Sequence, residues 1–242
     1  MAKIHVFLQG KGGVGKSFCA TMLAQYLMDH DRTVICIDTD PVNMTFANYP
    51  RFEAIQIDLM TGQNIDPLKF DQIIEHISTT DAENIIIDNG ASSFVTFSNF
   101  LLENTIPAML TEEGHQILLH TIITGGTGQY DTVYGFVSLA QQFEGTLLYV
   151  WLNPYLGNIE HEGKPFTEFK PYLDNANRVA GIIEIPAFSP ETFGANFTEM
   201  LKSRKTFAEA TAPEVQLPIM TKHRLKMIQK RIYDAIALCP EI

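Results

Sequence analysis

The sequence has few basic residues, few cysteines and no long apolar run, and each shortage excludes a class of protein. Its 242 residues hold 17 Lys and Arg against 28 Asp and Glu, and the net charge of −11 argues against a general nucleic-acid coat. The three cysteines, Cys19, Cys36 and Cys239, lack paired spacing, so neither a disulfide framework nor a metal knuckle is indicated. No run approaches the ~20 apolar residues that a membrane span needs.

Length and composition favour one domain over residues 1–242. A hydrophobic content of 45% is enough for one substantial core, and α/β domains of this size are common. The chain passes from Met1 directly into an apolar run, which leaves no room for a signal peptide, so we expect a cytoplasmic protein. The seven histidines are scattered without metal-ligand spacing, and we interpret them as structural.

Apolar runs typical of buried strands alternate with segments of helical periodicity. This alternation predicts an α/β fold with a doubly wound, mostly parallel sheet. The segment Gly125-Gly126-Thr127-Gly128 lacks the lysine of a phosphate loop, and we interpret it as a strand-to-helix turn. The polar loop 157–165 is left unassigned. The expected strands are 3–9, 33–38, 54–59 (weak), 84–88, 116–123, 146–152 and 178–185, and the expected helices are 17–29, 66–77, 94–101, 133–143, 190–202, 206–210 and 221–238.

The segment from Gly10 to Ser17 fits the phosphate-loop pattern Gly-x-x-x-x-Gly-Lys-Ser/Thr and lies between an expected strand and an expected helix. Its glycines allow the backbone to approach a polyphosphate closely, so that successive N–H groups point inward. Lys16 is expected to reach the β- and γ-phosphates, and the Ser17 hydroxyl to bind Mg²⁺. The nucleotide-binding loop comprises Gly10, Lys11, Gly12, Gly13, Val14, Gly15, Lys16 and Ser17.

Carboxylates follow two of the expected strands. Asp38 is the last residue of the run TVICID, and Asp40 follows two residues later. Asp88 is the last residue of the run NIIID. Because chemistry in open α/β sheets gathers at the carboxyl ends of strands, these residues are candidates for Mg²⁺ coordination and for positioning water. The alternative for Asp40 is that Asp-Pro only begins a turn.

Lys11 gives the loop a second lysine, in the form Lys-Gly-Gly-Val-Gly-Lys-Ser, the deviant Walker A pattern. With this loop the sequence resembles the ParA/MinD family of P-loop ATPases. The resemblance implies that Lys11 reaches across an ATP-sandwich homodimer to the partner's nucleotide. It further implies that Asp40, in a switch I segment (residues 38–45), orients the attacking water, while Asp38 supports the metal shell and Asp88 holds Mg²⁺ at the start of a switch II segment (residues 88–93).

The same resemblance implies contacts to the nucleotide outside the loop. Asn153, after the strand 146–152, would read the adenine, although a plain Asn-Pro turn is the alternative. The backbone after Pro186 would frame the base, and Phe18 would complete the nucleotide-binding set. The chain departs from the family in Pro41-Val42-Asn43, where Pro-Gln-Gly-Asn is usual, and it lacks the prolines that often follow the Walker B Asp.

Longer strings resemble the ParA-like proteins of plasmid conjugal-transfer regions: LQGKGGVGKS, IDTDPVN, IDNGASSF, WLNPY and IEHEGK. This similarity implies a slow, partner-stimulated ATPase switch that binds a protein of a transfer or partition apparatus. An ATP-dependent metabolic synthetase of the same fold is the alternative, although we find no residues dedicated to a small-molecule substrate. An iron–sulfur carrier would need cysteines placed to hold a cluster, and the three cysteines do not qualify.

The C-terminal part differs in charge from the rest. From Leu201 onward eight Lys and Arg face four acidic residues, so this part carries +4 and the remainder −15. In the helix 221–238, an apolar face is expected to pack on the core, and Lys222, Lys226, Lys230 and Arg231 lie largely off it. No acidic residue stands among the five basic residues from Lys222 to Arg231. That basic side is either solvated or binds DNA or a membrane without sequence specificity, and we favour a phosphate-rich or acidic partner over lipid. Since the phosphate loop begins at Gly10, we expect no preceding domain for site-specific DNA binding.

Overall fold

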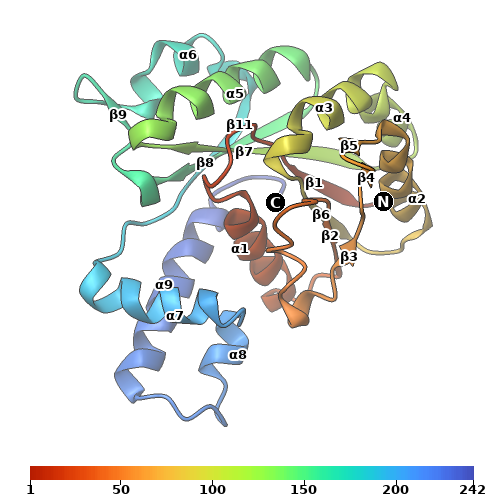
Figure 1. Ribbon diagram of the computed structural model, residues 1–242. Coiled ribbons are helices and arrows are strands. Elements are labelled where there is room, and N and C mark those ends of the chain that lie inside the picture. Colours follow the sequence, from red (N-terminus) through yellow and green to blue (C-terminus); the bar gives the residue numbers. More distant parts are fainter.

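A seven-stranded, fully parallel sheet forms the middle layer of the computed structural model (Figure 1). The structure describes residues 1–242, apart from the side chains of Pro190 and Thr192. The strand order β11-β8-β7-β1-β6-β2-β3 confirms the predicted doubly wound α/β fold. The strands are β1 (Lys3–Phe7), β2 (Val34–Asp38), β3 (Ile55–Gln56), β6 (Asn84–Asp88), β7 (Gln116–Thr124), β8 (Leu147–Asn153) and β11 (Val179–Glu184).

The central strands are apolar because helices cover both faces of the sheet. All five residues of β6 are buried, as is typical of a parallel sheet. In the register, Asp38 of β2 lies beside Asp88 of β6, and Phe7 of β1 lies on the other side of Asp88. The pairing therefore brings two carboxylates together where β1 leads into the phosphate loop.

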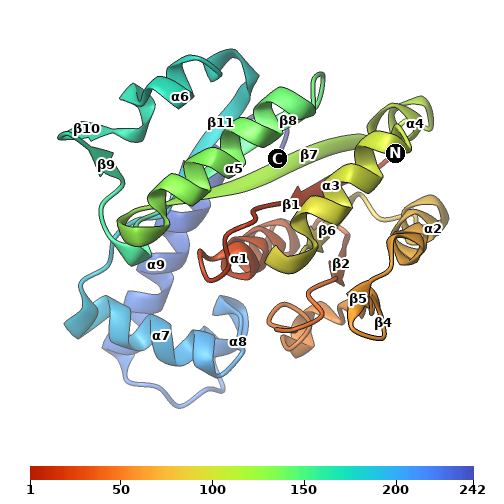
Figure 2. The ribbon, with the colours of Figure 1, turned by 45° about the horizontal axis from the view of Figure 1, so that its top comes forward.

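The helices divide between the two faces, each with its own hydrophobic cluster (Figure 2). One cluster is covered by the helix after the phosphate loop and by the C-terminal helices: α1 (Lys16–Asp29), α7 (Ala195–Lys202), α8 (Phe207–Thr211) and α9 (Ile219–Ala237). The other is covered by α2 (Asp71–Thr79), α3 (Phe94–Glu103), α4 (Ile106–Glu112), α5 (Gln129–Gln142) and α6 (Lys170–Leu173).

The apolar face of α9 packs on the core, as its periodicity predicts. Leu225, Ile228, Ile232 and Ile236 are fully buried, and the helix contacts α1, α7, α8 and β11. This face is therefore used inside the fold. Within the part of the chain that the structure describes, no helix is both long and apolar enough to cross a membrane.

Several small elements were not predicted. Two hairpins, β4 (Met60–Thr61) with β5 (Asn64–Ile65) and β9 (Glu160–His161) with β10 (Lys164–Pro165), turn through glycines of positive φ, Gly62 and Gly163. The weak strand expected over 54–59 is shortened to β3. The helices α4 and α6 were not predicted because they have only 7 and 4 residues, too few for a clear helical periodicity. A π-helical turn, η8 (Pro190–Gly194), precedes α7 in the helix expected over 190–202, and the short 3-10 turns are η1 (Pro50–Phe52), η2 (Pro67–Phe70), η3 (Ala91–Ser93), η4 (Gly126–Gly128), η5 (Pro154–Leu156), η6 (Phe166–Glu168) and η7 (Ala176–Arg178).

A hydrogen-bonded chain of buried rings crosses the middle of the sheet. The indole Nε1 of Trp151 donates to Nδ1 of His120 at 3.0 Å, and His120 Nε2 lies 3.0 Å from His5 Nδ1. His5 Nε2 in turn lies 3.3 Å from the side-chain oxygen of Asn84. Because Trp151 can only donate, each imidazole is satisfied as a neutral ring with its proton on Nε2. Burial lowers the pKa of His5 to about 4 and that of His120 well below its usual value.

Candidate functional site

The phosphate loop runs from the end of β1 to the first residue of α1. Gly13 and Gly15 have φ values of 75° and 101°, which side-chain-bearing residues rarely adopt. A Cβ at Gly15 would lie only 2.5 Å from Asn153 Nδ2, so this position also needs glycine for space. Gly15 caps α1 without a side-chain hydrogen bond, which leaves the first N–H groups of the helix for an anion.

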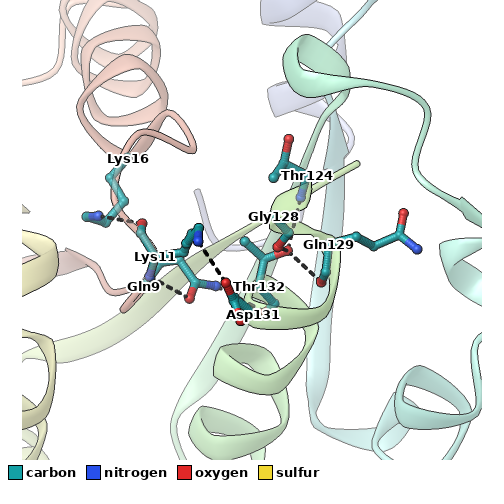
Figure 3. Close-up of polar contacts among 8 residues, drawn as sticks. All are labelled: Gln9, Lys11, Lys16, Thr124, Gly128, Gln129, Asp131 and Thr132. Atoms are coloured by element: carbon teal, nitrogen blue, oxygen red, sulfur yellow. Dashed lines mark hydrogen bonds and ion pairs between the residues drawn. The ribbon is translucent and has the colours of Figure 1, made fainter. Parts of the chain in front are cut away.

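Lys16, the first residue of α1, is buried among the acidic residues of the site. Its side chain is 7% exposed, and its Nζ lies 3.4 Å from the carbonyl oxygen of Lys11 (Figure 3). Burial lowers the pKa of Lys16, and attraction to Asp88 and Asp40 opposes this effect. The structure therefore brings Lys16 together with the carboxylates that the sequence analysis singled out.

The two carboxylates at the strand ends differ in their hydrogen bonds. The oxygens of Asp38 accept from the backbone N–H groups of Asp40 at 3.0 Å and Ala47 at 2.8 Å. Both oxygens of Asp88 are buried and accept no well-formed hydrogen bond from the described residues. Burial raises the pKa of Asp88 to about 7; the nearby Ser17 hydroxyl and Lys16 lower it, and Asp38 raises it further.

An unpartnered buried carboxylate beside a hydroxyl fits a hard cation. Mg²⁺ prefers oxygen ligands and commonly uses one or two carboxylates together with substrate phosphates and water. Ser17, Asp38 and Asp88 supply such oxygens at one place, and a cation there would remove the cost of burying the Asp88 charge. No group of three or more His, Cys, Asp or Glu among the described residues could hold a metal alone, and Mg²⁺ does not need one.

Asp40 holds the turn that follows it. Its Oδ1 accepts from the N–H groups of Val42 at 2.9 Å and Asn43 at 3.1 Å. This is the Asp-Pro turn that was the alternative interpretation, and it coexists with a position near Lys16. A Cβ at Gly90 would lie 3.1 Å from Asp40, so the two switch segments are in close contact at this glycine.

Asn89 was missed by the sequence analysis and joins the two switch segments. Its side-chain oxygen accepts from the hydroxyls of Thr39 at 3.1 Å and Ser93 at 2.9 Å. Thr39 also donates to the carbonyl of Asp88. The available signal was an amide placed directly after the buried Asp88, but its partner is 50 residues away in the chain.

Lys11 has a partner within its own chain. Its Nζ lies 2.8 Å from Oδ2 of Asp131, in the first turn of α5 (Figure 3), and the two side chains are 42% and 58% exposed. Gln9, two residues before Lys11, is buried and donates from Nε2 to the carbonyls of Ile122 and Thr132, each at 3.1 Å. The phosphate loop is thus tied to β7 and α5, and neither Asp131 nor Gln9 was predicted to take part.

The residues expected at the base come from three separate segments of the chain. Asn153 ends β8; its Nδ2 donates to the carbonyl of Val14 at 2.9 Å and its oxygen accepts from Tyr155 at 3.3 Å. Its side chain therefore positions the loop in this conformation. Pro186 is half-buried after β11, and Phe18 packs edge-on against Phe197 of α7.

Comparison with known proteins agrees with this geometry. The CbiA family, described as the CobQ/CobB/MinD/ParA nucleotide binding domain, matches residues 5–236. Two proteins from Escherichia coli, each described as "Protein TraL", are 49% identical to the chain; one alignment spans 237 residues and 98% of both chains, and the other spans 96% of both. The solved MinD cell division protein of Aquifex aeolicus has a similar fold, with a TM-score of 0.51 at 15% identity over 96% of this chain and 97% of that one. The chain therefore belongs to the CobQ/CobB/MinD/ParA nucleotide-binding domain family and is a near relative of TraL.

Proposed function

We propose that this protein is a Mg²⁺-dependent ATPase that acts as a nucleotide-controlled switch in plasmid conjugal transfer. The observation that carries the proposal is the unpartnered Asp88 carboxylate next to Lys16 and Ser17, at the end of a phosphate loop. Membership in a nucleotide-binding family and the similarity to TraL support it. In this function the protein works in the cytoplasm.

Each residue of the site has a role that its position supports. The glycine loop and the start of α1 bind the phosphates, and Lys16 stabilises the charge that develops on them. Ser17, Asp38 and Asp88 hold Mg²⁺, which supplies electrostatic stabilisation of the transferred phosphoryl group. Asp40 orients the attacking water once its carboxylate leaves the Val42 and Asn43 N–H groups.

Lys11 has a second role between subunits. In the proposed ATP-dependent homodimer, it leaves Asp131 and contacts the partner's nucleotide. The ion pair is half exposed, so breaking it costs little. Asn153 and the backbone at Pro186 contact the adenine, with Phe18 supporting the start of α1.

The switch is favoured over a metabolic synthetase by the surroundings of the switch segments. A synthetase that activates a carboxylate substrate would need a cation beside the terminal phosphate to bind it. The groove next to switch I and switch II has no charged residue in its described lining. The basic side of α9 is a further candidate contact for DNA phosphates or an acidic partner, because its apolar face is used in the core.

Calorimetry with Mg-ATP tests the proposal. Lys16→Ala should lower the affinity at least ~100-fold because it removes the cation that bridges the terminal phosphates. Lys202→Ala, an exposed lysine on α7, is the matched control and should bind like the parent. An unchanged affinity of Lys16→Ala would contradict the assignment of the site.

A further inference from the structure

A groove of about 470 Å³ lies beside the nucleotide site and is built by three separate segments. Pro41 and Val42 line it from switch I, Ser92 and Thr96 from the end of switch II and the start of α3, and the hairpin of residues 60–65 closes the third side. These segments lie next to one another in Figure 2. Since both switch segments contribute walls, the shape of the groove depends on their conformation.

The lining of the groove is uncharged, on a chain whose net charge is −11. Val42, Met60 and Ile65 provide apolar surface, and Gln63 and Asn64 provide amide groups. A charged group would lose its hydration here without gaining an opposite charge. The groove therefore suits an uncharged ligand with apolar side chains and groups that pair with amides and hydroxyls.

The apolar surface extends to the rim. Val42, one of the lining residues, is 73% exposed. Exposed apolar surface gathered around a groove is typical of a contact site rather than of free surface. In the described chain β4 and β5 pair only with each other. The N–H and the carbonyl of Met60 in β4 are bonded to the side chains of Asp58 and Lys69, so β5 is the strand whose outer edge an extended peptide can join.

We propose that this groove docks an uncharged, extended segment of a partner protein, and that the nucleotide controls its affinity. The control rests on the proposed function of Asp40. In this structure the Asp40 carboxylate holds the N–H groups of Val42 and Asn43, and so fixes the switch I wall of the groove. When Asp40 turns to the water at the nucleotide, the N–H groups of Val42 and Asn43 lose their hydrogen bonds to its carboxylate, and the switch I wall can move. The movement reaches switch II through Gly90, because the two segments are in contact there.

A phage-displayed library of random dodecapeptides, selected on the full-length chain with Mg-ATP, tests the inference. Selected sequences should have uncharged cores, and their synthetic versions should bind the parent in fluorescence anisotropy. Thr96→Arg and Gln63→Arg place a charge in the groove and should each weaken binding at least tenfold. Asn99→Arg, one turn further along α3 and outside the lining, is the matched control and should bind like the parent. Affinities with and without Mg-ATP should differ at least threefold.

Two further measurements separate this inference from the proposed function. Thr96→Arg should keep the parent's Mg-ATP affinity in calorimetry and its ATP-dependent dimer in light scattering. Peptides that bind Thr96→Arg as well as the parent, charged consensus sequences, or no enrichment would overturn the docking site. Loss of the dimer in Thr96→Arg would also overturn it, by assigning the groove to a second copy. If the parent protein binds no Mg-ATP, the proposed function and the nucleotide control are both wrong. If the parent binds Mg-ATP but the peptides bind equally well to the groove variants, only this inference is wrong.

Discussion

The same sheet holds two groups of buried polar side chains, and only one of them is satisfied. In the middle of the sheet, Trp151, His120 and His5 pass hydrogen bonds from one to the next and end on Asn84. At the carboxyl ends of the strands, Asp88 is buried with neither oxygen well paired. Polar groups that serve the fold are expected to find partners within it, whereas a group kept without one is a candidate for binding something else. The comparison therefore separates a structural site from a candidate functional site within one layer of the protein.

The largest effect should follow from a change at the functional site. Asp40→Ala is expected to lower ATP turnover about 100-fold while the ATP affinity changes less than about threefold, because positioning water acts on the transition state. Steady-state hydrolysis together with calorimetry measures both quantities. Asp81→Ala, an exposed acid outside the site, should leave both unchanged. Turnover by Asp40→Ala near that of the parent would move the water-positioning role to another residue.

The structural site should respond to pH through stability. His5 has a pKa of about 4 when folded and about 6.5 when unfolded, so the unfolded chain binds more protons between these values. The free energy of unfolding should therefore fall by about 3 kcal/mol as the pH falls from 6.5 to 4, and His120 adds to this loss. Above pH 6.5 the two histidines should cost nothing.

Asp88 opposes this dependence over the same range. Its pKa is raised to about 7, so the folded chain binds more protons than the unfolded chain from about pH 4 to 7. The histidine effect is therefore measured by denaturant unfolding of Asp88→Asn. If the free energy of unfolding of that variant stays constant as the pH is lowered from 6.5 to 4, the buried rings are protonated as readily in the folded chain as in the unfolded chain, and the assignment of neutral rings is wrong.

The fold and the course of the phosphate loop between β1 and α1 could be predicted from the sequence because both depend on local patterns. The buried strands are apolar runs, and the loop from Gly10 to Ser17 carries its geometry in its own glycines. The pairing of Asp38 with Asp88 could also be expected, because parallel strands align their carboxyl ends. The functional roles of all the site residues, those of the loop and of Asp38, Asp40 and Asp88 as well as those of Asn153, Pro186 and Phe18, stay predictions.

The missed features depend on contacts between distant segments. Lys11 and Asp131 are 120 positions apart in the sequence. Exposed acidic residues are common in the first turn of a helix, so the sequence does not indicate that Asp131 pairs with Lys11. Asn89 similarly gains its role from Thr39. The hairpin β4–β5 is too short for a strand pattern of its own, and its only local signal is Gly62 at the turn.

The smallest effect on stability is expected from the Lys11–Asp131 ion pair. Asp131→Asn should change the free energy of unfolding by less than about 1 kcal/mol, because both side chains are half exposed. Its consequence should appear in assembly, since Lys11 is then free to contact the second nucleotide. Light scattering with Mg-ATP should show more dimer for Asp131→Asn than for the parent, and none for Lys11→Ala. A dimer of Lys11→Ala as stable as that of the parent would rule out the contact between subunits.

Thermal unfolding of Asp88→Asn, with and without Mg-ATP, is the most direct test of whether Asp88 is kept unpaired for a metal. Without Mg-ATP the variant should be more stable than the parent by about 4 kcal/mol at pH 8, where the buried charge is present, and nearly equal to it at pH 4. With Mg-ATP the melting temperature of the parent should rise, and that of Asp88→Asn should rise much less because a metal ligand is lost. A variant that is no more stable alone, and that gains as much from Mg-ATP as the parent does, would contradict the account.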